Sequence, residues 1–321
     1  MCRIRDTGPE MTWVPWRWSS GDGSLQLVEV DLRVLREPFI EADLDRALQD
    51  GAPTLWVDAD HWPTSPGPAV IVVHPGRSGS TLVSRGLDAL GVVSYREPQG
   101  FVDWVHVCAG ESGSDRRLRD VGPRLARAFG AATDAPTAIK LSSIVTPLVG
   151  SLVPALPATL FVAVVRDVEQ VLSSVLASPP SHSQLLYSPV VEVERYWPGA
   201  IEVLAGRPLT LPRLVALSWS AAVDAIAAIP ASRRVLIDYQ DFVIDPVATY
   251  SSIHERIGLP GPERRTVDRL LAVFARHSKR GDRYGSDSGN LDFSVPEFVS
   301  ADVEQMTAAS RARLAEARLV D

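Results

Sequence analysis

The stretch that decides the fold is residues 70–91, VIVVHPGRSGSTLVSRGLDALG. It begins with four apolar residues, passes through a His-Pro-Gly turn and a run of small residues, and ends in an apolar pattern of helical spacing. A strand, a small-residue loop and a helix in this order form a cradle for phosphate-like groups. The fingerprint of nucleotide triphosphate sites ends in Gly-Lys-Ser/Thr, but this loop has no lysine. The stretch predicts an anion-binding loop, although the same layout also occurs in tight connections that bind nothing.

Strands and helices alternate on the C-terminal side of this stretch. Alternation of this kind is typical of an α/β fold, in which a parallel sheet is flanked by helices on both faces. Ligands of such sheets bind beyond the carboxyl ends of the strands. Apolar runs predict strands at 69–73, 91–95, 137–143, 159–165 and 233–239. Helical patterns cover 80–90, part of 115–130, 168–178, 211–230 and 246–258.

Residues 1–68 are predicted to be a small N-terminal extension packed on the core, and residues 69–321 the α/β domain. The extension carries aromatic and alternating patterns at 13–18 and 24–35 that suggest short strands. A short helical pattern at 41–51 ends in a glycine, and a proline-rich linker closes the extension.

The composition excludes several classes of protein. A net charge of -7 and a pI of about 5.4 argue against nonspecific nucleic-acid binding, which depends on neutralising phosphates. Two cysteines, Cys2 and Cys108, allow neither a disulfide framework nor a metal site built from cysteines. The N-terminus has no apolar signal core, and the apolar run at 148–165 contains a glycine and two prolines. We therefore expect a cytoplasmic protein without a membrane partner, for which a homodimer is compatible with the sequence, and we expect 148–165 to be a turn followed by a buried strand.

Two further elements suggest anion contacts. Arg166 directly follows a predicted buried strand, and Ser174 lies eight residues later in the next helix, so the two side chains could grip a second phosphate. The alternative is a surface ion pair of Arg166 with Asp167 or Glu169, which would contribute little. The segment SKRGD at 278–282 is polar and basic, and on its own it suggests only a solvated loop.

Together these segments resemble the sulfotransferases that use 3′-phosphoadenosine 5′-phosphosulfate (PAPS). The likeness spans roughly residues 69–285. PGRSGSTLV is similar to the family's phosphosulfate loop, and RDVEQVLSS resembles its 3′-phosphate motif. IDYQDFVIDP is similar to a structural family segment of the form Y-E-D-L-x-x-D-P, and SKRGD to a late basic loop that also holds the 3′-phosphate.

The resemblance implies roles for particular residues. Arg166 and Ser174 would hold the 3′-phosphate, and Lys140, one of only two lysines in the chain, stands where many members carry a lysine that touches the transferring group. A sulfuryl group carries less charge than a phosphoryl group, so arginine, lysine and backbone dipoles could suffice without a metal ion. The first loop would hold the 5′-phosphosulfate through Gly76, Arg77, Ser78, Gly79, Ser80 and Thr81. The late loop would close over the 3′-phosphate with Lys279, Arg280 and Gly281.

The general base departs from the pattern of many cytosolic members. They have Lys-x-His before the 3′-phosphate motif, whereas this chain reads Lys140-Leu141-Ser142. Other branches use a glutamate shortly after the first helix, and Glu97 stands there. Glu97 could instead be an exposed carboxylate in a turn before Pro98. His182, Asp103 and His106 are weaker candidates for the base.

The resulting hypothesis is an enzyme that moves a sulfuryl group from PAPS to a hydroxyl of a small molecule and releases adenosine 3′,5′-bisphosphate (PAP). Glu97, Arg77 and Lys140 would be its catalytic residues. The arginine-rich, lysine-poor composition suggests a GC-rich bacterium and hence a specialised metabolite as acceptor. The alternatives are a small-molecule kinase on a variant loop and a noncatalytic nucleotide-binding protein. Residues that could line an acceptor pocket or belong to the core are Trp104, His106, Tyr187, Tyr196 and Trp197.

Overall fold

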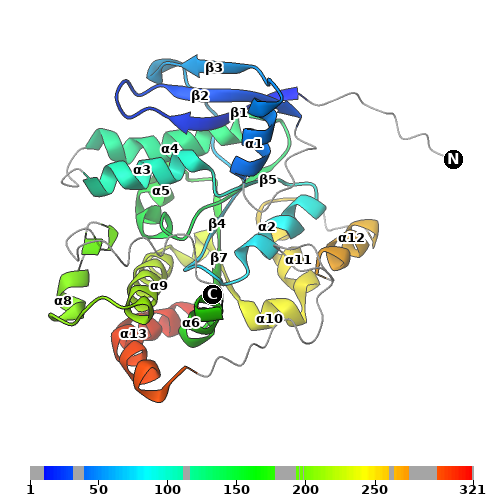
Figure 1. The fold of residues 1–321 in the computed structure, drawn as a ribbon. Helices are drawn as coiled ribbons and strands as arrows, with labels where there is room; N and C mark the ends of the chain where they lie inside the picture. The colour runs from blue at the N-terminus through cyan, green and yellow to red at the C-terminus, as the bar shows by residue number, and fades with distance from the viewer. Residues whose placement is uncertain are drawn as a thin grey trace.

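In the residues that it describes, the computed structural model of the chain has two sheets, a small antiparallel one and a larger parallel one (Figure 1). The structure describes residues 11–31, 40–110, 116–177, 193–194, 196–197, 199–259, 264–274 and 295–319.

The larger sheet has, in the described part of the chain, five parallel strands in the order β5-β6-β4-β7-β8. Of its three inner strands, β4 and β7 are buried at every residue, which explains why they read as unbroken apolar runs rather than alternating ones. The sequence prediction of a parallel α/β sheet is confirmed. The strands are β4 (Val70–Val73), β5 (Val93–Arg96), β6 (Thr137–Lys140), β7 (Leu160–Val165) and β8 (Arg234–Asp238).

Helices cover both faces of this sheet. Alternate residues of β4 point to opposite faces, so Val70 and Val72 belong to one apolar cluster while Ile71 and Val73 belong to another. The first cluster includes residues of α2 (Ser80–Ala89), α10 (Tyr239–Ile244), α11 (Pro246–Arg256) and α12 (Arg264–Phe274). The second cluster is larger and includes residues of α3 (Gln99–Gly110), α4 (Arg116–Gly130), α5 (Val149–Ala155), α6 (Val168–Ala177), α9 (Leu211–Ala227) and α13 (Glu297–Arg318).

The N-terminal residues form the second sheet, which lies over α3 and α4 at the top of Figure 1. Its antiparallel strands are β1 (Met11–Trp18), β2 (Leu25–Asp31) and β3 (Thr54–Val57), with α1 (Ile40–Gln49) inserted between the second and third. Val14 and Trp16 are buried in the same apolar cluster as Phe101 and Trp104 of α3. The N-terminal sheet therefore shares its core with the parallel sheet's helices.

Several elements differ from what the sequence pattern predicts. The segment expected to be a turn before β7 contains the short helix α5, which has Pro154 in its last turn and ends before Leu156. The strand β7 that follows agrees with the prediction. The sequence pattern predicts neither α3 nor the long α13. The buried face of α13 is made largely of small or polar residues such as Thr307, Ser310 and Ala317, so its apolar stripe is faint in the sequence.

Among the residues that the structure describes, the remaining short elements are the helix α8 (Ala200–Leu204) and the 3-10 turns η2 (Ala59–His61), η3 (Thr146–Leu148) and η5 (Ala231–Arg233). Across the residues that the structure describes, every helix is too short or too polar to span a bilayer. The same residues hold no group of three or more histidine, cysteine, aspartate or glutamate side chains placed to bind a metal ion.

Candidate functional site

The predicted site residues follow the carboxyl ends of adjacent parallel strands. Glu97 follows β5, Lys140 ends β6, the loop 74–79 follows β4, and Arg166 follows β7. The strand register places Lys140 opposite both Arg96 and Val72, so the first three ends lie side by side. The sheet therefore puts Lys140 and Glu97 on one side of the loop and Arg166 on the other.

The loop 74–79 is anchored at its start by His74, which is buried. Its Nδ1 accepts a hydrogen bond from the Gly76 N–H at 3.0 Å, and its Nε2 lies 2.9 Å from the Leu141 carbonyl. These partners require a neutral imidazole that carries its proton on Nε2. The Thr146 hydroxyl also donates to the His74 carbonyl at 2.9 Å. The Gly76 N–H is therefore engaged within the protein, and candidate anion donors begin with the N–H of Arg77.

The backbone of the loop is left-handed at Gly76 (φ 93°), Arg77 (φ 48°) and Gly79 (φ 88°). Left-handed residues within a turn are typical of the concave N–H arrangements that bind anions, and α2 begins directly after Gly79. The Arg77 side chain is half-buried, and this burial lowers the pKa of its guanidinium below the ordinary value. A partly desolvated cation beside a helix N-terminus suits an anionic ligand, and a phosphosulfate in this loop stays a prediction.

The hydroxyl residues of the loop are more buried than the motif suggested. Ser78 is fully buried, and its Oγ has no hydrogen-bond partner among the described residues. Ser80 and Thr81 each keep only 4% of their surface exposed. An anion in this loop would therefore depend more on backbone N–H groups and Arg77 than on a row of open hydroxyls.

Glu97 and Lys140 form an ion pair between neighbouring strand ends. The Lys140 ammonium contacts Oε1 of Glu97, and the Glu97 N–H donates to the Lys140 carbonyl at 2.7 Å. The lysine side chain is 1% exposed and the glutamate side chain 21% exposed. Glu97 has a positive φ of 52°, which a side chain other than glycine adopts only when its surroundings hold it there. Glu97 is thus a fixed, partly open carboxylate rather than a free surface one.

Arg166 lies close to the loop from the other side. Its Nη1 is 3.4 Å from the Arg77 carbonyl, and its Nε donates to Gln170 at 3.0 Å. The guanidinium carbon lies 4.8 Å from the centre of the Tyr239 ring, a cation–π distance. Tyr239 also packs so closely against Gly79 that a side chain there would collide with the ring. One tyrosine therefore contacts both the loop and the arginine.

The alternative interpretation of Arg166 is a surface ion pair with Asp167 or Glu169. In the structure these two carboxylates lie near a different arginine. Asp167 and Glu169 lie near Arg311 of α13, at 3.4 and 3.9 Å. Ser174 is half-buried on α6, the helix that follows Arg166. Its role as a phosphate ligand stays a prediction.

The structure describes some of the remaining candidate residues, and others lie outside the described part of the chain. Asp103 accepts a hydrogen bond from Gln99 at 2.7 Å, and His106 shares one of 2.7 Å with Tyr196. Trp104 is 1% exposed and belongs to the core, and Trp197 lies in a smaller buried cluster. The predicted residues outside the described part of the chain are His182, Tyr187, Lys279, Arg280 and Gly281.

Sequence reasoning misses two residues of this site. The pattern places His74 only in a turn and Tyr239 only in a structural segment. Each directly follows a strand of the parallel sheet, and that position is the available signal. Their contacts join residues far apart in the sequence, so spacing alone could not reveal them.

No protein-family model and no curated protein matches the sequence. Solved structures do match. Sulfotransferase STF9 from Mycobacterium avium is 14% identical and aligns over 76% of this chain and 76% of its own, with a TM-score of 0.48. Sulfotransferase STF1 from Mycobacterium tuberculosis H37Rv is 15% identical over 84% and 83%, with a TM-score of 0.44. Mouse sulfotransferase SULT7A1, in complex with PAP, is 10% identical over 81% and 89%, with a TM-score of 0.43. These solved structures, to which the chain is similar in the path of its backbone, are sulfotransferases.

Proposed function

We propose that this protein transfers the sulfuryl group of PAPS to a hydroxyl group of a small-molecule acceptor. One observation carries the proposal. An anion-type loop lies between the Lys140–Glu97 ion pair on one side and Arg166 on the other, at the same edge of one sheet. This order separates the groups suited to proton removal from those suited to a 3′-phosphate.

Glu97 acts as the general base in this proposal. A hydroxyl that attacks sulfur loses its proton, and a positioned carboxylate accepts it. Lys140 favours the ionised, proton-accepting form of the carboxylate, because an opposite charge at close range stabilises the charged state. The hydrogen bond from the Glu97 N–H to the Lys140 carbonyl fixes the backbone that carries the base.

Arg77, the loop N–H groups and finally Lys140 stabilise charge on the leaving group. Bound PAPS supplies the activated sulfuryl group and leaves as PAP. Once Glu97 holds a proton, Lys140 has lost the negative charge of its partner, and negative charge developing nearby becomes favourable for the ammonium. Arg166 and Ser174 hold the 3′-phosphate away from the reacting atoms.

The experiment that tests the proposal compares the calorimetric affinity for PAP with that for AMP and measures turnover of PAPS with a panel of phenols and alcohols. We expect PAP to bind at least 10-fold more tightly, since a charge-assisted phosphate contact contributes about 1.5–3 kcal/mol. Equal affinities would remove the 3′-phosphate site and overturn the proposal. Binding of PAP without turnover of any acceptor would instead favour a noncatalytic nucleotide-binding protein, and turnover of ATP would favour a kinase.

A further inference from the structure

Strands β7 and β8 end in the same local design. Each strand is followed by a helix, and an aspartate stands at the junction. Asp167 accepts the Glu169 N–H at 2.8 Å at the start of α6, and Asp238 accepts the Gln240 N–H at 2.9 Å at the start of α10. An aspartate in this position stabilises the first turn of the helix that follows. Each aspartate is also the immediate neighbour of a candidate ligand-side residue, Arg166 in one case and Tyr239 in the other.

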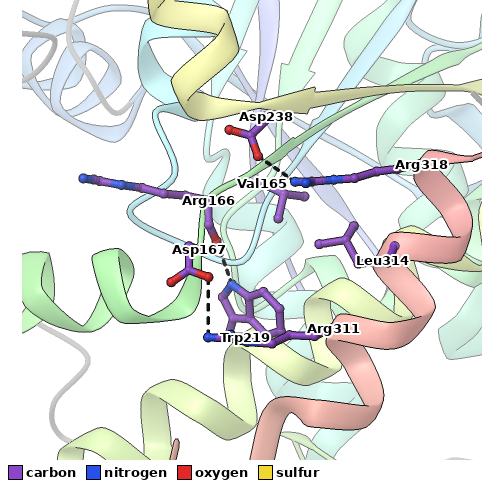
Figure 2. A pocket seen from close by; sticks show the side chains of 9 residues that line it. Val165, Arg166, Asp167, Trp219, Asp238, Arg311, Leu314 and Arg318 are labelled. Carbon is purple, nitrogen blue, oxygen red and sulfur yellow. Dashed lines mark hydrogen bonds and ion pairs between the residues drawn. The ribbon is translucent and has the colours of Figure 1, made fainter. Parts of the chain in front are cut away.

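The second oxygen of each aspartate lies near an arginine of α13. Arg311 is 3.4 Å from Oδ2 of Asp167, and Arg318 is 2.6 Å from Oδ2 of Asp238. The two arginines are seven residues apart, which is close to two helical turns, so they share a face of α13. Figure 2 shows both pairs on one side of the helix, with Leu314 between the arginines.

We propose that α13 is a clamp that positions the 3′-phosphate side of the site, with Arg311 holding the β7 end and Arg318 holding the β8 end. In this role the two arginines are positioning residues, because they act through Asp167 and Asp238 rather than on the ligand. The proposal rests on the proposed function, since it assumes that Arg166 binds a phosphate.

The packing around these pairs explains why the ion pairs matter here. A cavity of about 190 Å³ lies between α13 and the two strand ends, lined by both arginines, both aspartates and Trp219. The Trp219 indole N–H donates to the Arg166 carbonyl at 3.0 Å and so fixes the backbone at Arg166. Leu314 of α13 also lines this cavity and is buried, and the two arginines reach across the open space to the strand ends. The pairs are half-exposed and should contribute little to overall stability, so their effect is expected on geometry.

The two ends of the clamp should have different effects. Arg311 acts next to Arg166, whose contact with the Arg77 carbonyl of the anion loop is long, at 3.4 Å, so loss of Arg311 should weaken mainly contacts with the 3′-phosphate. Arg318 acts next to Tyr239, which contacts Arg166 and also packs against Gly79 of the anion loop. Loss of Arg318 should therefore weaken both the 3′ and the 5′ side of the site.

The test is calorimetry of PAP and AMP on the full chain with Arg311→Ala and Arg318→Ala. We expect Arg311→Ala to lose roughly 5-fold in PAP affinity with AMP affinity unchanged, and Arg318→Ala to lose a similar factor for both ligands. Arg313→Ala is the matched control, because Arg313 pairs with Asp224 of α9 on another face of the same helix. We expect the control to match the wild type for both ligands.

The outcomes separate the clamp from the proposed function. A wild-type chain that binds PAP and AMP equally would overturn the proposed function itself. A selective wild type whose Arg311→Ala variant keeps full selectivity would overturn the clamp alone. Equal losses in Arg313→Ala and Arg311→Ala would also overturn it, because they would indicate general loosening of α13. Where an alanine variant does not fold, Asp167→Asn keeps the capping oxygen and removes the charge, and it should show the same selective loss of PAP affinity.

Discussion

At the scale of single residues, the site depends on backbone conformations that most side chains avoid. Arg77 and Glu97 are two of the three residues other than glycine that have a positive φ in the described part of the chain. Such conformations cost of order 1–3 kcal/mol each and persist where surrounding contacts fix them. For Glu97 those contacts are both the side chain and the carbonyl of Lys140.

Gly79→Ala should abolish nucleotide binding and destabilise the protein. Gly79 has φ 88°, and a Cβ there would collide with the Tyr239 ring. Gly91→Ala is the matched control, since Gly91 has the same φ of 88° but a Cβ there would meet nothing within 4 Å among the described residues. We expect the control to lose about 1 kcal/mol of unfolding free energy and Gly79→Ala clearly more. Chemical denaturation measures both, and equal losses would contradict the close contact.

Glu97→Gln should lower kcat by roughly 10²–10⁴ while leaving PAP affinity near that of the wild type. Glutamine keeps the size of the side chain but cannot accept the proton. Single-turnover kinetics and calorimetry check the two parts separately. A nearly normal kcat would move the role of base to His182, Asp103 or His106, and loss of PAP affinity as well would indicate a structural role for Glu97.

Lys140→Met and Arg77→Ala should each lower kcat by roughly 10²–10³, because both cations act on charge that develops as the bond to the leaving group breaks. Steady-state kinetics with PAPS as the varied substrate measures the effect. A higher KM for PAPS with an unchanged kcat would show that these residues only anchor the bound donor.

At the scale of elements, α11 is fixed to α2 by a buried phenol. The Tyr250 hydroxyl donates to the Val83 carbonyl at 2.8 Å and lies 3.2 Å from the Leu82 carbonyl. Gly86 leaves room for it, because a Cβ at that position would overlap the hydroxyl. Full burial raises the pKa of the Tyr250 phenol well above its ordinary value of 10.0. The contact holds the helix that begins at the anion loop.

Tyr250→Phe should lower the unfolding free energy at neutral pH by about 1 kcal/mol, the usual net contribution of such a hydrogen bond. The raised pKa of Tyr250 also predicts how the unfolding free energy changes at alkaline pH. The stabilisation from the protonated phenol is complete below the ordinary pKa and is lost as the pH rises above it, because unfolding then releases a proton. The variant should therefore lose less stability than the wild type between about pH 8 and about pH 11. Urea denaturation at both pH values measures this, and parallel losses would contradict it.

At the scale of the whole molecule, the N-terminal extension and the α/β domain share one apolar core. Val14, Trp16 and Trp18 are buried in the same cluster as Phe101, Trp104 and other residues of the parallel sheet's helices. The Thr12 hydroxyl also bonds to the Ala132 carbonyl. The sequence pattern changes near residue 68, but the apolar core continues across that point.

A chain truncated to residues 69–321 should not fold cooperatively. Truncation would expose several large apolar side chains, and each costs about 1.5–3 kcal/mol of unfolding free energy. Their sum is comparable to the whole unfolding free energy of a typical protein, about 5–15 kcal/mol. Thermal unfolding followed by near-ultraviolet circular dichroism, with the full chain as control, measures this. A sharp transition in the truncated chain would show that the α/β domain folds without the extension.

Local features of the sequence determined the parallel sheet and the first loop. Buried parallel strands must be apolar on both faces, so the apolar runs at β4 and β7 could be predicted to be strands from the sequence alone. The same is true of Arg166, whose place after a buried strand follows from the pattern. The helix α13 could not be predicted from the sequence pattern, because helices that pack through small and polar residues have no clear apolar stripe.

The tertiary structure alone decided which of these residues meet. The folded sheet placed Glu97 beside Lys140, and Tyr239 against both Gly79 and Arg166, although these partners are 43 to 160 residues apart. It also brought Arg311 and Arg318 to the ends of β7 and β8. Local sequence encodes strand, loop and helix through short-range sterics and burial, whereas the pairing of distant strands depends on how all the apolar faces are covered at once.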